Sequence, residues 1–214
     1  MAQPKFLVIE GPIGVGKTSL ARRLADTFGS ELLLEGAAEN PFLERFYRNP
    51  RQAALPTQLF FLFQRAHQLS ELCQDDIFQP VRVADFLMEK DRLFAELTLD
   101  EEELKLYDQA YRHLAPKAPT PDLVVYLQAP AEVLLERIRR RGIPSEQSID
   151  LDYLKRIVDS YTRLFHFYDQ TPLLIVNAAA FDPINRESDY QALLEHVMSL
   201  PQGRQYFNPL PLAL

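Results

Sequence analysis

The sequence contains a single cysteine and no long apolar segment, and its charge is not weighted towards the basic side. Cys73 has no second thiol with which to form an internal disulfide, which is typical of a reducing cytoplasm. We expect it to be a small buried residue on a helix rather than a catalytic thiol. No apolar run reaches the length of a membrane span, and the N-terminal residues lack the pattern of a secretion signal. We therefore expect a cytoplasmic protein that does not bind a membrane.

Acidic residues outnumber basic ones, 30 to 23, which gives a net charge of −7. Because nucleic-acid phosphates select for basic surfaces, we expect no nucleic-acid partner. A length of 214 residues with 47% hydrophobic and 25% charged residues is typical of one globular domain. No repeat or linker interrupts the chain, and the proline-rich connection Pro116–Pro121 is too short to separate two domains. The sequence therefore predicts a single domain over residues 1–214.

A glycine-rich segment, Gly11–Thr18, follows the apolar run Phe6–Ile9 and precedes a helical pattern. It fits the phosphate-binding pattern G-x-x-x-x-G-K-[ST] in the strand–loop–helix context that this pattern requires. The glycines allow backbone N–H groups to close around phosphates, and the helix N-terminus adds its positive dipole. We therefore predict a nucleoside triphosphate site in which Lys17 neutralises the β- and γ-phosphates and Thr18 binds Mg²⁺. The residues expected to contact ATP are Gly11, Gly14, Val15, Gly16, Lys17 and Thr18.

Strand-like and helix-like segments alternate along the chain. The runs with the composition of buried parallel strands are Lys5–Glu10, Glu31–Glu35, Val81–Asp85, Asp122–Gln128 and Leu173–Asn177. The helical patterns cover Thr18–Phe28, about Leu55 to Gln74, a stripe of Leu104, Tyr107 and Tyr111 capped by Asp100, Ala131–Arg141 and Leu151–Tyr168. This order predicts an α/β fold, a three-layer sandwich of the P-loop type with a five-stranded parallel sheet. The tail Pro201–Leu214 is expected to be irregular.

A carboxylate, Glu35, stands at the end of the second predicted strand. Ligands of open parallel sheets bind beyond the carboxyl ends of the strands, so Glu35 is expected to face the transferred phosphoryl group. A carboxylate there can accept the proton of an attacking hydroxyl. From its position alone, a solvated acid in a loop explains Glu35 equally well.

Four arginines, Arg137, Arg139, Arg140 and Arg141, end the fourth helical pattern before Gly142. Cations at a helix C-terminus are favoured by the helix dipole, and this explanation suffices for Arg139 and Arg140. Arg137 and Arg141 are four residues apart and share a helix face. For this pair we favour a role in stabilising charge on the transferred group.

The long helical pattern carries a polar set, Gln58, Gln64, Arg65 and Gln68, among phenylalanines. A glutamine amide offers a donor and an acceptor in one plane, which suits the edge of a nucleobase. A helix with one solvated face explains the same residues, and the pattern alone does not choose among the four.

These features, in this order, resemble the deoxynucleoside kinase family over nearly the whole chain. The segment Glu35–Leu43 is similar to the family's stretch of an acid followed by N-P-F/W, which implies Glu35 as the base that deprotonates the 5′-hydroxyl. The family's tyrosine before a proline falls on Tyr47, and this match implies that Tyr47 holds the sugar 3′-hydroxyl. The family's glutamine and arginine, seven residues apart, fall on Gln58 and Arg65, which implies contacts with the base. Gln64 and Gln68 then need no functional role.

The segment Arg137–Glu146 resembles the family's lid, R-I-x-x-R-G-R-x-x-E. The resemblance implies a lid over about residues 137–150, in which Arg137 and Arg141 clamp phosphates and Glu146 partners the sugar 3′-hydroxyl. The family's E-Y-L after the lid is matched by Asp152–Leu154.

Two positions depart from the family pattern. The usual acid-R-S after the third strand reads Asp85–Leu87 here, so Phe86 replaces an arginine that commonly contacts the 5′-hydroxyl. Ile143 replaces a third lid arginine. Asp85 keeps an acid at the strand end, where a place near Mg²⁺ and a helix N-cap are equally good explanations.

The residues that follow, 85–95, look closer to bacterial deoxyguanosine and deoxyadenosine kinases. We assign no base contact to Lys90 or Asp91 from the sequence.

The resemblance implies an ATP- and Mg²⁺-dependent kinase that phosphorylates the 5′-hydroxyl of a deoxynucleoside, with purines favoured. It also implies a homodimer whose two chains pair through helices. A dimer surface would explain the apolar residues Phe60, Phe61 and Leu62, and core packing explains them equally well. One alternative is a nucleoside monophosphate kinase of the thymidylate type, which would need an Asp-Arg pair where this chain has Glu35 and a glycine. The other is a nucleotide-binding regulatory module without turnover, for which the loss of the arginine at Phe86 is the best support.

Overall fold

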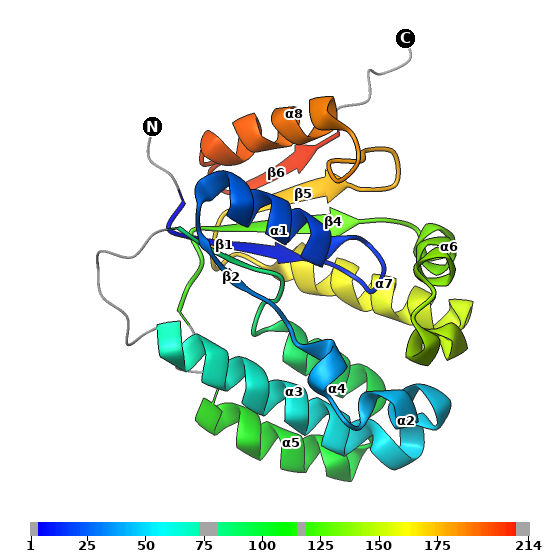
Figure 1. Ribbon diagram of the computed structural model, residues 1–214. Helices are drawn as coiled ribbons and strands as arrows, with labels where there is room; N and C mark the ends of the chain where they lie inside the picture. Colours follow the sequence, from blue (N-terminus) through cyan, green and yellow to red (C-terminus); the bar gives the residue numbers. More distant parts are fainter. Residues whose placement is uncertain (1–3, 73–80, 115–118, 209–214) are drawn as a thin grey trace.

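The structure is a computed structural model that describes residues 4–72, 81–114 and 119–208 (Figure 1). Cys73 and the first part of the Pro116–Pro121 connection lie outside the described residues, so the expectations for both stay predictions. Among the described residues, no helix is both long and apolar enough to cross a membrane. The strands of the described ranges form one sheet, and the expectation of a single domain stays a prediction.

The sheet has six parallel strands in the order β2-β3-β1-β4-β5-β6. Their bounds are β1 Phe6–Glu10, β2 Glu31–Leu33, β3 Arg82–Ala84, β4 Leu123–Gln128, β5 Leu173–Asn177 and β6 Arg204–Phe207. Every residue of β1 is buried, as expected for a central strand covered on both faces. The apolar runs therefore predicted the five strands from β1 to β5 with small errors at their ends.

The prediction of five strands was wrong by one, because β6 lies inside the tail that we expected to be irregular. Its four residues alternate between exposed and half-buried positions at the edge of the sheet. An edge strand of this kind lacks the continuous apolar run that marks a buried parallel strand. The sequence therefore carried little signal for it.

Helices cover both faces of the sheet, with α1 and α8 on one side and α7 and α4 on the other (Figure 1). The helices are α1 Lys17–Phe28, α2 Leu43–Arg48, α3 Pro50–Leu72, α4 Lys90–Thr98, α5 Glu101–Leu114, α6 Ala131–Arg141, α7 Leu151–Phe167 and α8 Glu187–Met198, with short 3₁₀ helices η1 Ala37–Glu39 and η3 Pro144–Ser148. The sequence analysis missed α2, α4 and α8, and it began α3 five residues late. The three-layer α/β arrangement is confirmed.

Asp100 caps α5, as its position before the Leu104 stripe predicted. Its Oδ1 accepts hydrogen bonds from the backbone N–H groups of Glu102 and Glu103, at 3.0 and 2.9 Å. The Glu103 carboxylate in turn accepts from the Asp100 N–H at 3.3 Å, which completes a capping box.

Core packing explains two of the three residues that fitted a dimer surface equally well. Phe61 and Leu62 are buried, and Leu62 belongs to the main hydrophobic core. Phe60 is half-buried, whereas the neighbouring Phe63 is 56% exposed. The apolar surface that α3 presents to solvent is therefore at Phe63.

Candidate active site

The loop between β1 and α1 is built on glycines at positions where a side chain would not fit. Gly16, which precedes α1, has a φ of 106°, in the left-handed region that favours glycine. A Cβ on Gly11 would lie 2.5 Å from the Leu127 carbonyl oxygen at the end of β4. The loop therefore packs tightly against the sheet edge and leads directly into the N-terminus of α1, the arrangement of an anion-binding loop.

Lys17 lies across this loop. Its Nζ donates to the carbonyl oxygens of Gly11 and Pro12, at 2.7 and 3.2 Å. Burial, together with the positive charge of Lys90, lowers the pKa of Lys17 to about 8. The Lys17 ammonium is thus poorly solvated, so an added anion would stabilise its charge.

A cavity beside the loop brings together residues from segments far apart in the chain, from Ile13 to Tyr161. Every candidate residue outside the glycine loop except Arg137 borders it. The predicted site residues that line it are Gly14, Lys17, Thr18, Glu35, Tyr47, Gln58, Arg65, Asp85, Arg141 and Glu146. The sequence therefore located half of the residues that line this cavity, from segments more than a hundred residues apart.

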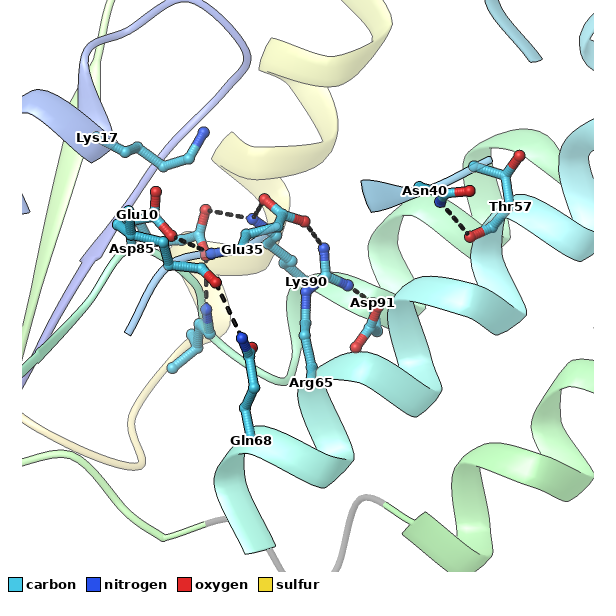
Figure 2. Close-up of polar contacts among 12 residues, drawn as sticks. Glu10, Lys17, Glu35, Asn40, Thr57, Arg65, Gln68, Asp85, Lys90 and Asp91 are labelled. Atoms are coloured by element: carbon cyan, nitrogen blue, oxygen red, sulfur yellow. Dashed lines mark hydrogen bonds and ion pairs between the residues drawn. The ribbon is translucent and has the colours of Figure 1, made fainter. Parts of the chain in front are cut away.

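Glu35 follows β2, which ends at Leu33, and its side chain points towards two cations (Figure 2). One carboxylate oxygen is paired with an Arg65 guanidinium nitrogen, and the other accepts from Lys90 Nζ at 2.7 Å. The Glu35 side chain is 17% exposed. Glu35 is therefore held inside the cavity as part of a charged network and is not a solvated loop acid.

Asp85 joins the phosphate-binding loop to the segment that carries Glu35. Its Oδ2 accepts from Thr18 Oγ1 at 2.5 Å, and its Oδ1 accepts from the backbone N–H of Glu35 at 2.7 Å. A hydroxyl and a carboxylate beside a triphosphate are the sparse protein ligand set that Mg²⁺ uses, because phosphates and waters supply the rest. Thr18 and Asp85 thus fit the metal that the loop motif implies.

The part of the cavity bordered by α3 holds the residues expected to contact a base. Arg65 is buried between Glu35 and Asp91, and it pairs with both carboxylates. Burial lowers the pKa of Arg65 to about 10, against the raising influence of Glu10. Gln58 is 3% exposed, and its Nε2 donates to Thr98 Oγ1 at 3.3 Å. The rings of Phe61 and Phe94 border the same cavity.

The other two glutamines of the predicted polar set, Gln64 and Gln68, bind groups that do not line the cavity. Gln64 Nε2 donates to the Glu39 carboxylate at 2.9 Å, and Gln68 Nε2 donates to the Leu34 carbonyl at 3.1 Å. These contacts fix the segment on either side of Glu35 to α3. The structure thus gives both glutamines a positioning role.

Tyr47, Arg141 and Glu146 border another part of the cavity. Arg141 Nη2 lies 2.5 Å from Glu146 Oε2, which ties the end of α6 to η3. Burial raises the pKa of Tyr47, and the negative charge of Glu146 adds to the effect. These three side chains are therefore close enough to act on one ligand.

Arg137 lies apart from this cavity. Its guanidinium donates to the Val15 carbonyl at 3.3 Å and to the Ala178 carbonyl at 2.7 Å, so it ties α6 to the phosphate-binding loop and to the segment after β5. It borders a second hollow with the loop glycines and with residues 181–185, and Arg141 borders both hollows. The role of Arg137 as a phosphate clamp stays a prediction.

The sequence analysis gave no role to three charged residues of the network, Glu10, Lys90 and Asp91. Glu10 ends β1 and is fully buried. Its carboxylate accepts hydrogen bonds from the backbone N–H groups of Gly11 and Leu87, at 2.9 and 2.8 Å. It also accepts one from the Tyr161 hydroxyl at 2.9 Å. A carboxylate ending an otherwise apolar strand was a usable signal. The sequence carried no comparable signal for Lys90 and Asp91, because their burial depends on where α4 packs.

Comparison with known proteins places these observations in a family. The model of the deoxynucleoside kinase family matches residues 7–201. A deoxyguanosine kinase of Bacillus subtilis is 34% identical over 201 residues, 91% of this chain and 97% of its own. A deoxyguanosine kinase of Lactobacillus acidophilus is 30% identical, covering 90% of this chain and 89% of its own.

A solved structure is similar in fold. The deoxyadenosine kinase of M. mycoides with bound dATP matches with a TM-score of 0.78 at 20% identity, covering 90% of this chain and 98% of its own. At this identity the likeness shows the shared fold.

Proposed function

This chain belongs to the deoxynucleoside kinase family, and from that premise we propose that it transfers the γ-phosphoryl group of ATP to the 5′-hydroxyl of a purine deoxynucleoside. The observation that carries the proposal is Glu35, which lies in one cavity with Lys17 and Thr18 of the phosphate-binding loop. The names of the curated relatives from Bacillus and Lactobacillus support a purine substrate.

The donor would bind at the glycine loop. Backbone N–H groups at the start of α1 and the Lys17 ammonium face the phosphates in this arrangement. Thr18 and Asp85 would hold Mg²⁺, which neutralises charge on the β- and γ-phosphates when bound. Arg137 and Arg141 would stabilise charge on the transferred group from α6.

The acceptor would bind in the cavity, with its 5′-hydroxyl at Glu35. The carboxylate takes the hydroxyl proton as the new bond to phosphorus forms. Tyr47 and Glu146 hold the sugar 3′-hydroxyl, while Gln58 and Arg65 contact the base. Phe61 and Phe94 supply apolar surface beside it, which suits the faces of an aromatic base.

Replacing Glu35 by Gln tests the base directly. The amide keeps the size of the side chain but accepts a proton poorly, so kcat should fall by about 10²–10⁴-fold. Binding of ATP, measured by calorimetry, should remain near that of the wild type because the phosphate-binding loop is unchanged. A kcat close to that of the wild type would remove Glu35 from the mechanism.

The acceptor class needs a separate assay. Radiolabelled ATP, offered with four deoxynucleosides and four deoxynucleoside monophosphates, should label deoxyguanosine or deoxyadenosine first. Preferential labelling of a monophosphate would favour a thymidylate-type kinase, and absence of any transfer would favour a regulatory nucleotide-binding protein.

A further inference from the structure

The arginine that commonly follows the third strand in this family is replaced here by a residue that faces elsewhere. Phe86 is 1% exposed and belongs to the main hydrophobic core. It borders a hollow with Phe6, Val8 and Leu69, separate from the cavity that holds Glu35. The loop after β3 therefore brings the Asp85 carboxylate to the reaction site, and Phe86 brings no cation there.

A cation reaches the same place from the next helix. Lys90 is the first residue of α4, and its side chain is 2% exposed. Its Nζ lies 2.7 Å from Glu35 Oε2 and 3.7 Å from Glu10 Oε1, so two buried carboxylates share one ammonium group. Lys90 also borders the cavity that contains Lys17 and Thr18. It is thus placed between Glu35 and the phosphate-binding loop.

The charges around Lys90 explain why a lysine is stable at a buried position. Glu10 and Glu35 supply two negative charges, and Arg65, the other cation of the network, divides its contacts between Glu35 and Asp91. A buried ion-pair network of this kind is costly to break, since loss of one partner leaves an uncompensated charge. Such a network often adds little to the stability of a protein. Because this network borders the cavity, we attribute its charges to function.

We propose that Lys90 takes the place of the missing arginine. It orients the Glu35 carboxylate and donates a hydrogen bond to the 5′-oxygen that attacks the γ-phosphorus. This inference rests on the proposed function. An ammonium carries three N–H donors. Glu35 accepts one at 2.7 Å, and Glu10, at 3.7 Å, is an ion-pair partner beyond hydrogen-bond distance, so donors remain for the 5′-oxygen. In the reaction the 5′-oxygen forms its bond to the γ-phosphorus while the bond from phosphorus to the ADP oxygen breaks. The hydroxyl proton passes to Glu35, and Lys90 keeps its protons throughout.

Three variants test this role by steady-state kinetics. Lys90→Met removes the charge at similar length, and kcat should fall by about 10²–10³-fold, the usual cost of losing one donor to a developing charge. KM for ATP should change by less than about fivefold, because the loop residues that bind ATP are untouched. Lys90→Arg keeps the charge and should retain at least about a tenth of the wild-type kcat. Arg92→Met is the matched control on the same helix, since Arg92 is more than half exposed, and it should leave both constants unchanged.

The dependence of kcat on pH supplies a second readout. It does not require a variant that lacks the charge, such as Lys90→Met, to fold. Burial lowers the pKa of Lys90 to about 8, against the raising influence of Glu10. The ammonium is present below that pH and lost above it. At saturating ATP, whose phosphates would keep the neighbouring Lys17 charged, the wild-type kcat should therefore fall as pH rises through about 8. In Lys90→Arg this fall should move to higher pH. The titratable and charged groups around Lys90 are Glu10, Lys17, Glu35, Arg65, Asp85 and Tyr161.

The outcomes separate the two proposals. An inactive wild type would overturn the proposed function and the role of Lys90 with it. An active wild type whose kcat survives Lys90→Met within about threefold would overturn the role of Lys90 alone. Equal losses in Lys90→Met and Lys90→Arg, or a pH profile that Lys90→Arg leaves in place, would also overturn it.

Discussion

Glu35 illustrates how single residues acquire their chemistry from buried neighbours. Each of its carboxylate oxygens has a cationic partner, Arg65 on one side and Lys90 on the other. Two charge-assisted contacts fix the orientation of the carboxylate more firmly than hydration would. The same residue in a solvated loop would be mobile and would face no acceptor.

Gln58 is the residue whose replacement should change base preference. Gln58→Ala removes an amide that is buried in the cavity, and the ratio of kcat/KM between purine and pyrimidine deoxynucleosides should change by about tenfold or more. Measurement of kcat/KM for all four deoxynucleosides checks this. Gln64→Ala, on the same helix but bound to Glu39, is the matched control. Equal losses on all four substrates in Gln58→Ala would contradict a base contact.

At the scale of elements, the segment from α6 to α7 carries several cavity residues in a short length of chain. The salt bridge between Arg141 and Glu146 ties the end of α6 to η3, and α7 then begins with Asp150 as its N-cap. Asp150 Oδ1 accepts from the Tyr153 backbone N–H at 2.7 Å. The cap thus fixes the first turn of the helix that brings Tyr153 and Tyr161 to the cavity.

Removing that cap should destabilise the protein measurably. Asp150→Ala is expected to lower the free energy of unfolding by about 1 kcal/mol, the typical value of an N-cap side chain. Asp152→Ala removes an acid from the first turn without removing the cap, and it should cost about 0.5 kcal/mol or less. Urea unfolding followed by circular dichroism compares the two. Equal effects would show that the cap bond contributes little.

The sequence predicted elements and site residues wherever the determining pattern was local. The glycine loop stands in a recognisable spacing, and the five apolar strands are continuous runs. Glu35 and Arg65 were singled out by the resemblance to the family, because their positions alone left the solvated explanation open. The missed strand β6 is a half-exposed edge, and α8 is flanked by segments without a marked pattern. The sequence carried no signal that Lys90 supplies a cation where Phe86 replaces an arginine, because the burial of Lys90 depends on how α4 packs against α3 and α7.

At the scale of the whole molecule, α3 and α5 form the layer farthest from α8 (Figure 1). Both helices expose apolar side chains, with Phe63 at 56% and Leu106 at 52% exposure. Exposed apolar surface on packed helices is typical of a protein interface, although isolated residues of this kind are also common on monomers. We propose that the homodimer expected from the family forms through this layer.

A charge at Phe63 tests the dimer. A buried unpaired carboxylate opposes association, so Phe63→Glu should convert the dimer to a monomer. Light scattering after size-exclusion chromatography should then give the mass of one chain instead of twice that mass. Tyr206→Glu is the control, since Tyr206 is 72% exposed on the edge strand β6, which lies beside α8 (Figure 1). A Phe63→Glu variant that remains dimeric would move the interface elsewhere.

Buried phenols should limit stability at high pH. Burial raises the pKa of Tyr168 to about 12, against the lowering effect of its hydrogen bond with Thr171. The unfolded chain releases this proton near pH 10, so the free energy of unfolding should decline from pH 10 towards pH 12. In Tyr168→Phe the decline should be shallower, whereas Tyr206→Phe, at a 72% exposed site, should follow the wild type. Denaturant unfolding at several alkaline pH values checks the slopes.

Arg65 has a consequence for any attempt to retarget this kinase to another nucleoside. One guanidinium contacts both Asp91, which is fully buried, and Glu35, the carboxylate at which the alcohol would react. A substitution selected at Arg65 for a new nucleobase would therefore disturb turnover on every substrate, old and new alike. Evolution or engineering of selectivity is better directed at positions such as Gln58, whose partner Thr98 is not part of the reacting charge network.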